Sequence, residues 1–99
     1  MILRLYGTAQ ACYPGDAGWD EMVAHFPDLP GKRQIFDMQV ELVQTSCGFA
    51  VPFMEFVSER ETLFKWAEKQ GDAGLKAYWA KKNVTSIDGF ETGMQAQLG

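Results

Sequence analysis

The amino-acid sequence predicts a small α+β domain in which antiparallel strands are covered by a C-terminal helical hairpin. Two stretches, residues 2–12 and 34–46, alternate apolar and other side chains with the period of a β-strand. Three stretches, residues 17–26, 59–70 and 73–82, repeat apolar residues at helical spacing. At 99 residues, the chain is expected to form one domain, residues 1–99.

The overall composition excludes several classes of function. A net charge of -4 argues against nucleic acid as a partner, because phosphate binding requires clustered Lys and Arg. No apolar run approaches the roughly 18 to 20 residues that span a bilayer, and the N-terminus lacks the pattern of a signal peptide. Cys12 and Cys47 are too few for a disulfide framework. These features predict a cytoplasmic, reduced protein without a membrane partner.

The first predicted strand, residues 2–12, has one face that becomes small toward its end. Gly7, Ala9 and Ala11 follow Leu3 and Leu5 on this face. Small residues permit close approach, so we expect a helix or a neighbouring sheet to pack there; a ligand is the alternative.

The first predicted helix, residues 17–26, follows a turn in which Asp16 is a suitable N-cap. The helical spacing of its apolar residues predicts one apolar face, and the prolines that follow it predict its C-terminal end. His25, the only histidine, lies beside the apolar face, which indicates a surface residue rather than a catalytic one. With one histidine and two distant cysteines, the sequence predicts no metal site.

The second predicted strand, residues 34–46, places Phe36, Met38, Val40 and Leu42 on one face. The alternation breaks near Val43, after which hydrogen-bonding side chains occupy both faces. If the two strands are antiparallel neighbours, Cys12 and Cys47 lie much more than about 7 Å apart, which excludes a disulfide between them.

The second half of the chain is predicted to be mainly helical. Residues 48–57 are apolar and aromatic, and Pro52 excludes a regular helix, so we expect a buried irregular or extended segment. Ser58 and Glu61 form a capping-box pattern for a helix that ends at Gly71. A second helix follows at once, which predicts a hairpin. Trp66 and Trp79 are interpreted as its packing core rather than as a stacking platform.

Residues 84–99 are too polar and glycine-rich to predict a helix. We expect a tail that docks on the body and frays after Met94. Two strands alone are marginal in water, so the chain is expected to assemble with copies of itself or to be part of something larger. The strand that starts directly after Met1 favours the second alternative.

Two motifs of the chain are distinctive, Gln44-Thr45-Ser46-Cys47-Gly48 and Ser86-Ile87-Asp88-Gly89. They occur together with Leu3-Arg4-Leu5-Tyr6-Gly7, Pro14-Gly15-Asp16, Trp19-Asp20-Glu21, Phe26-Pro27, Leu29-Pro30-Gly31, Val51-Pro52, Met54-Glu55, Glu59-Arg60 and Trp66-Ala67-Glu68. In these motifs the chain, over residues 2–94, resembles the later half of a bacterial family, the pyridoxamine 5'-phosphate oxidase-like, flavin-binding split-barrel proteins.

The resemblance implies a six-stranded split β-barrel that binds FMN at a homodimer interface. Full-length members carry a further N-terminal half, with several barrel strands and most contacts to the flavin phosphate. This sequence lacks that half, so we expect a partial split β-barrel, as a fragment or a shortened relative.

Five residues are predicted to line a flavin pocket: Gln44, Thr45, Ser46, Cys47 and Gly48. Their side chains can hydrogen-bond a ring edge, and glycine allows close backbone approach. The alternative is an ordinary strand end with local side-chain-to-backbone hydrogen bonds. No catalytic residue is indicated.

Two functions follow from this sequence. The resemblance implies a flavin-dependent oxidoreductase with FMN as its cofactor, in which the flavin performs the redox chemistry. The alternative is a non-enzymatic interaction module that self-associates through its apolar faces and binds no flavin. The sequence indicates no substrate.

Overall fold

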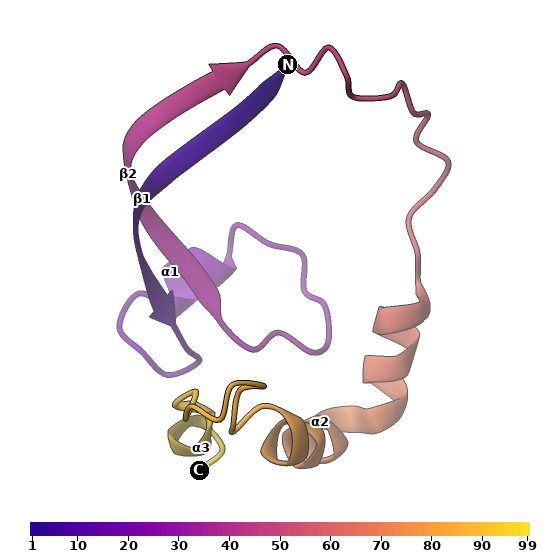
Figure 1. Ribbon diagram of the computed structural model, residues 1–99. Helices are drawn as coiled ribbons and strands as arrows, with labels where there is room; N and C mark the ends of the chain where they lie inside the picture. The colour runs from indigo at the N-terminus through magenta and orange to yellow at the C-terminus, as the bar shows by residue number, and fades with distance from the viewer. The chain divides into compact units, whose positions relative to one another are not determined.

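The computed structural model describes residues 1–99 and has the elements β1 (Ile2–Cys12), α1 (Trp19–Val23), β2 (Ile35–Ser46), α2 (Thr62–Lys82) and α3 (Met94–Gln97) (Figure 1). The predicted α+β class is confirmed. The chain divides into two compact units. Unit 1 contains residues 1–26 and 34–59, and unit 2 contains residues 27–33 and 60–99.

Unit 1 is built on the two strands that the alternation predicted, β1 and β2, which pair as an antiparallel ribbon. Its register runs from Ile2 opposite Ser46 to Cys12 opposite Ile35. The two cysteines therefore belong to opposite ends of the ribbon, and both are free thiols. The predicted absence of a disulfide between them follows from this pairing.

A β-bulge interrupts the ribbon. Tyr6 lies opposite Leu42 and the next residue, Gly7, lies opposite Val40, so Glu41 is the extra residue on β2. Because side chains alternate along a strand, one extra residue exchanges the faces beyond it. The break in the alternation near Val43 is the sequence signal of this bulge.

The bulge changes which side chains share a face. Directly paired residues point to the same side of a sheet, so Leu5 and Val43 share a face with Gly7 and Val40. Leu42 pairs with Tyr6 and lies on the opposite face. The prediction that Leu42 shares a face with Phe36, Met38 and Val40 is therefore wrong, because it assumed an uninterrupted strand.

Gly7 has a steric role at this bulge. A Cβ atom at Gly7 would lie 1.9 Å from the carbonyl oxygen of Gln39 on the neighbouring strand. No side chain fits at that separation, so glycine permits the close backbone approach. The close neighbour of Gly7 is thus the paired strand β2 of the same sheet, and not the helix or second sheet that was expected to pack on the face of Gly7, Ala9 and Ala11, which is exposed.

Helix α1 is shorter than predicted and begins differently. Gly18, with φ of 88°, occupies the N-cap position of the five-residue helix. The Asp16 carboxylate instead accepts a hydrogen bond from the backbone N–H of Tyr13 at 2.8 Å. The prediction of Asp16 as N-cap of a helix over 17–26 is wrong, because Asp16 closes the preceding turn and the left-handed Gly18 starts the helix later.

Residues 47–61 form no helix or strand. The predicted irregular backbone is confirmed, but the predicted burial of residues 48–57 is wrong: Phe49 is 95% exposed and Val57 is 91% exposed. The physical reason is that no part of the chain covers this segment.

The start of α2 also differs from the prediction. Glu61, not Ser58, is at the N-cap, without a side-chain cap. The Glu61 carboxylate pairs with Lys65 Nζ at 2.6 Å. The predicted capping box is wrong, because this side chain reaches forward along the helix rather than back to Ser58.

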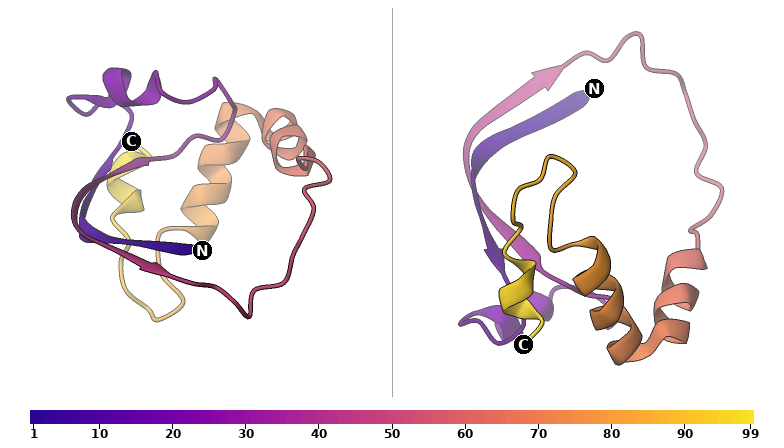
Figure 2. Two further views of the ribbon diagram at one scale, coloured as in Figure 1. Left: turned by 90° about the horizontal axis from the view of Figure 1, so that it is seen from above. Right: turned by 60° about the horizontal axis from the view of Figure 1, so that its bottom comes forward.

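Helix α2 contains a break at Gly71, where the sequence predicted one helix to end. Its φ of 66° and ψ of 175° are not helical, and two helical segments meet there at an angle (Figure 2). The Trp66 and Tyr78 rings lie edge to face, with centroids 5.0 Å apart. The two segments therefore contact each other, and Ala67 and Leu75, one on each segment, are buried.

The C-terminal region folds onto itself through short-range hydrogen bonds. Thr85 and Glu91 form a β-bridge around the turn Ser86–Gly89, and the Ser86 hydroxyl accepts from the Phe90 N–H at 3.1 Å. The Thr92 hydroxyl donates to the carbonyls of Asn83 and Val84. The expectation of no helix is wrong, because α3 forms one turn that begins at the buried Met94.

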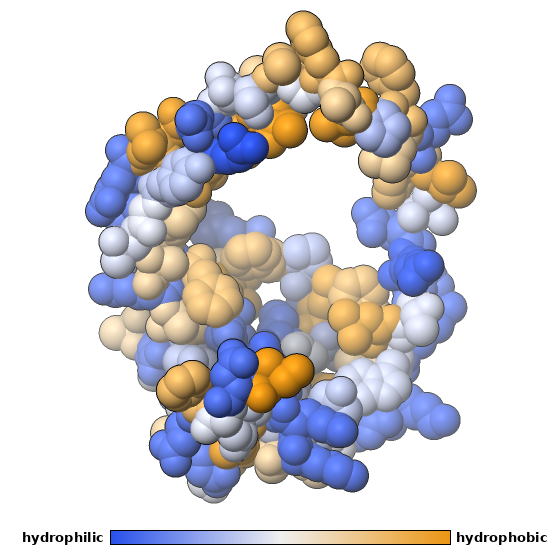
Figure 3. Space-filling view, in the orientation of Figure 1, coloured by the Kyte–Doolittle hydropathy of each residue, from blue (hydrophilic) through white to orange (hydrophobic).

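The chain buries few apolar side chains. Four are buried: Cys12, Ala67, Leu75 and Met94. Many large apolar side chains are instead exposed, among them Phe36 in unit 1 and Leu63 in unit 2. On the face drawn in Figure 3, apolar side chains accordingly appear at the surface.

Candidate functional site

The five residues predicted to line a pocket lie at one end of the ribbon. Gln44, Thr45 and Ser46 are the last residues of β2, and Cys47 and Gly48 follow it. Because side chains alternate, Gln44 and Ser46 share one face of the ribbon and Thr45 lies on the other, opposite Leu3. The structure therefore brings Gln44 and Ser46 together and separates Thr45 from them.

Strand β1 contributes two further polar residues to the face of Gln44 and Ser46. Arg4 pairs directly with Gln44, and Tyr6 is its diagonal neighbour. The Tyr6 hydroxyl donates to Gln44 Oε1 at 3.3 Å. We define Arg4, Tyr6, Gln44 and Ser46 as the ribbon-end cluster. Sequence reasoning missed Arg4 and Tyr6 as site residues, because only the strand register places them beside Gln44.

Ser46 has a property that distinguishes it from an ordinary strand-end serine. Its Oγ atom is buried and has no hydrogen-bond partner. A buried hydroxyl without a partner costs free energy unless a ligand or water completes it. Ser46 Oγ is therefore a buried polar atom of the cluster that other groups of the chain leave unpaired.

The turn after β2 brings its backbone close to the start of β1. Gly48 has φ of 65°, and its carbonyl accepts from the Val51 N–H at 2.9 Å. A Cβ atom at Gly48 would lie 3.4 Å from Ile2 Cγ1. The positive φ of Gly48 lies in the left-handed region, which favours glycine at this turn. The neighbouring Cys47 is exposed.

The cluster combines several kinds of hydrogen-bonding group. Arg4 offers a cationic donor fork, and Gln44, Ser46 and Tyr6 offer amide and hydroxyl groups. Cys12 lies at the other end of the ribbon, where burial, followed by the charges of Asp16 and Asp37, raises the pKa of its thiol. A raised pKa disfavours the reactive thiolate.

Two further observations concern ions and membranes. No three His, Cys, Asp or Glu side chains gather closely enough to hold a metal ion. None of the helices combines the length and the apolar character that crossing a membrane requires.

The chain was compared with models of protein families, with curated proteins and with solved structures, and none of the three comparisons found a match. The resemblance to flavin-binding split-barrel proteins therefore stays a prediction.

Proposed function

We propose that this chain contributes the β1–β2 ribbon to a split β-barrel flavoprotein of the pyridoxamine 5'-phosphate oxidase-like type, which binds FMN and acts as a cytoplasmic homodimer in redox chemistry. The observation that carries the proposal is the ribbon-end cluster, in which Gln44 is held by Tyr6 and the buried Ser46 hydroxyl has no partner.

The form of the ribbon supports a place in a larger barrel. A two-stranded ribbon is marginal by itself and leaves both outer edges unpaired. Its bulge gives the local bend and twist that barrel strands use. One face, with Leu5, Val40 and Val43, is apolar yet exposed. Further strands would pair with the two edges, and a covering core would bury this apolar face.

The chemistry of the cluster fits a flavin. The Gln44 amide can donate and accept hydrogen bonds at the edge of the flavin ring, and the Ser46 hydroxyl can do the same from a buried position. Arg4, the cation on this face, is suited to the phosphate. When bound, FMN supplies the redox chemistry, and the residues of the chain hold and orient it.

The test is retention of FMN by the purified protein. After incubation with FMN and gel filtration, we expect absorption at roughly 450 nm to elute with the protein. Gln44→Leu removes the amide at similar size and should weaken FMN binding at least tenfold. Gln39→Leu is the matched control, because Gln39 lies on the same strand beyond the bulge. A wild-type protein that never retains FMN contradicts the proposal.

A second candidate, a self-associating interaction module without flavin, is favoured by one separate observation. The segment 49–57, called here the apolar segment, exposes Phe49, Phe53 and Phe56. A standard interface buries about 800 Å² per partner, and exposed aromatic side chains such as these are suited to the apolar centre of such an interface.

Light scattering of the flavin-free protein during gel filtration tests this candidate. We expect a dimer, and Phe53→Asp should raise its dissociation constant at least tenfold. Ile87→Asp is the matched control, because Ile87 is also fully exposed but lies in the Ser86–Gly89 turn. A monomeric wild-type protein, or equal effects of the two substitutions, would sink this candidate.

A further inference from the structure

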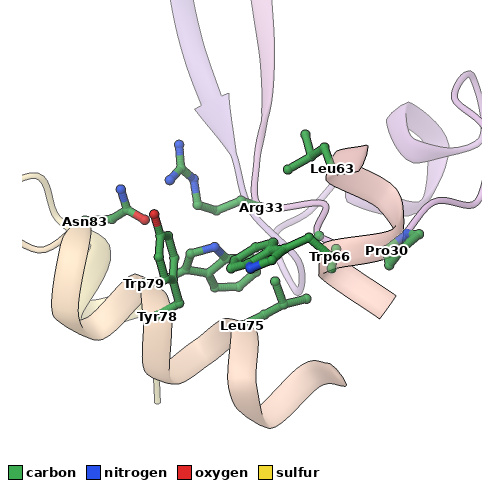
Figure 4. A pocket seen from close by; sticks show the side chains of 10 residues that line it. Pro30, Arg33, Leu63, Trp66, Leu75, Tyr78, Trp79 and Asn83 are labelled. Atoms are coloured by element: carbon green, nitrogen blue, oxygen red, sulfur yellow. The ribbon is translucent and has the colours of Figure 1, made fainter. Parts of the chain in front are cut away.

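Unit 2 contains a cavity that the proposed function does not use. Its volume is about 360 Å³, and its wall is formed by both segments of α2 and by residues that precede β2 (Figure 4). Pockets that bind small molecules have volumes of about 300 to 1,000 Å³. This cavity is therefore of a size that suits one aromatic ring or a small fused ring system.

Two small residues of the wall bring the backbone before β2 close to α2. Gly31 and Ala67 both line the cavity, and Ala67 is buried. A Cβ atom at Gly31 would lie 3.4 Å from Ala67 Cβ. The wall is therefore fixed at this point by a close backbone approach.

Aromatic side chains form much of the rest of the wall. Trp66 and Trp79 are half-buried, and the Trp66 ring lies edge to face against Tyr78, with centroids 5.0 Å apart and an interplanar angle of 74°. The buried Leu75 also lines the cavity. Indole rings offer flat, apolar surfaces for a planar ring. These contacts favour the stacking role, which is the alternative interpretation of the two tryptophans in the sequence.

Two uncharged polar groups lie at one side of the cavity. In the view of Figure 4 the Tyr78 hydroxyl and the Asn83 amide lie on one side of the two indole rings, and Pro30 lies on the other. A hydroxyl and a carboxamide can each donate and accept hydrogen bonds. The cavity therefore suits a ring that carries an uncharged hydrogen-bonding group at one edge.

The wall offers no unengaged counter-charge to a charged ligand. Arg33 is the one charged residue that lines the cavity, and it already takes part in an interaction within the chain. An anion would have to compete with that interaction. No acidic residue lines the cavity, so a cation would lie near a guanidinium without a carboxylate to balance it. Because moving a charge out of water without a partner is costly, the lining favours an uncharged ligand.

We propose that unit 2 binds a small, uncharged, planar aromatic molecule, with its ring against Trp66 and Trp79 and its polar group toward Tyr78 and Asn83. Burial of the apolar ring provides the affinity, and the two polar side chains orient the ligand. The proposal is independent of flavin binding, which involves residues of unit 1.

The tryptophans provide a direct readout by NMR. In ¹H–¹⁵N spectra of the full chain titrated with tryptophol, an uncharged indole alcohol, we expect saturable shifts of the indole N–H signals of Trp66 and Trp79. Trp19 belongs to α1 in unit 1 and is the internal reference. Indole-3-acetate and tryptamine carry the same ring with an anionic and a cationic group. Tryptophol should bind at least tenfold more tightly than either of these compounds.

Substitution of Trp79 tests the aromatic side of the cavity. Trp79→Leu should weaken tryptophol binding at least tenfold, as followed by the Trp66 signal, because it removes one of the two flat surfaces. Trp19→Leu is the matched control, since Trp19 is also half-buried but lies in unit 1. Equal losses in the two variants contradict the proposal.

Substitution of Asn83 tests the polar side. Asn83→Ala removes the side-chain amide and retains the backbone N–H that caps α2. It should weaken tryptophol binding several-fold and leave the binding of 3-methylindole, which has no hydroxyl group, unchanged. An equal loss for the two compounds would refute the proposed orientation of the ligand.

The ligand series on the unmodified chain decides the matter even if Trp79→Leu does not fold. No saturable shift of the Trp66 and Trp79 signals with tryptophol identifies the cavity as a packing gap and overturns the proposal. Equal or tighter binding of indole-3-acetate or of tryptamine shows that the cavity does not select an uncharged ligand and overturns it as well.

Discussion

The ribbon of unit 1 and the broken helix of unit 2 satisfy different requirements of a folded chain. The ribbon pairs its backbone over the whole of β1, yet only Cys12 among its side chains is buried. Helix α2 is interrupted at Gly71, yet it buries Ala67 and Leu75 and helps to enclose a cavity. Unit 2 thus makes a small core of its own, whereas unit 1 has a hydrogen-bonded frame with an uncovered apolar face.

This difference assigns different sources of stability to the two units. Apolar burial is the dominant favourable term in folding, and hydrogen bonds contribute less in net terms. A ribbon without a core therefore depends on exact strand pairing and on what covers it. A helix pair with a core tolerates a local break. The substitutions below probe this contrast, beginning with the largest expected effect.

Substitution at Gly7 should damage unit 1 most. Gly7→Val places a Cβ atom 1.9 Å from the Gln39 carbonyl oxygen, and backbone cannot move aside as a flexible side chain does. We expect loss of the ribbon, at a cost of more than about 3 kcal/mol. Far-UV circular dichroism and urea unfolding measure the effect. A variant with wild-type stability would show that the strands do not approach as described.

Two glycines in α2 separate backbone strain from helix propensity. Gly71→Ala should destabilise by about 1 to 3 kcal/mol, because a φ of 66° with a ψ of 175° is suited to glycine alone. Gly74→Ala, three residues later, should be neutral or stabilising by up to about 1 kcal/mol, since Gly74 is helical and a Cβ atom there would lie 3.2 Å from Cβ and Oε1 of Gln70, a close contact but not a clash with backbone. Urea unfolding of both variants is the measurement, and equal effects would refute the break at Gly71.

The two cysteines report on the two ends of the ribbon. Cys12 is buried and its pKa is raised, first by burial and then by Asp16 and Asp37, whereas Cys47 is exposed. Below its raised pKa the Cys12 thiol holds its proton, so alkylation near neutral pH should be slow. We expect iodoacetamide to modify Cys47 at least tenfold faster, as measured by mass spectrometry of peptides. The reverse order would contradict the burial of Cys12.

The smallest effect is expected at an exposed ion pair of unit 2. A hydrogen bond from Lys32 Nζ at 2.6 Å, together with its charge, lowers the pKa of Asp28. Because the folded-state pKa lies below the unfolded one, the pair stabilises the fold above the unfolded pKa, and this contribution is lost as the pH falls through the folded pKa. Asp28→Asn should remove only this small dependence of the free energy of unfolding on acidic pH. Acid unfolding of both proteins is the measurement, and a large loss of stability at neutral pH would contradict it.

The sequence predicted the elements of the fold better than their ends. Alternation over residues 2–12 and 34–46 indicated both strands, because the period of two is a property of each strand alone, whereas their antiparallel pairing was only assumed. The bulge at Glu41 depends on how two strands meet, so the alternation could not place Leu42 correctly. The positions of Gly18 and Glu61 at helix starts were missed for a similar reason, since turn geometry decided between competing caps.

Candidate site residues were predicted only in part, for the same physical reason. Gln44 and Ser46 could be selected by residue type and by resemblance, whereas Arg4 and Tyr6 join them only through the register. The apolar segment shows a different limit of prediction from sequence. Its aromatic residues predicted burial, but hydrophobicity favours burial without specifying what provides it.

Native mass spectrometry with added FMN tests the central claim most directly, because it counts chains and cofactor together. The account predicts a complex of two chains, twice the mass of 11.1 kDa, that retains FMN. Two chains without FMN would leave the self-associating module as the function. A single chain without bound FMN would contradict both the flavin site at the end of the ribbon and the second copy that covers its apolar face.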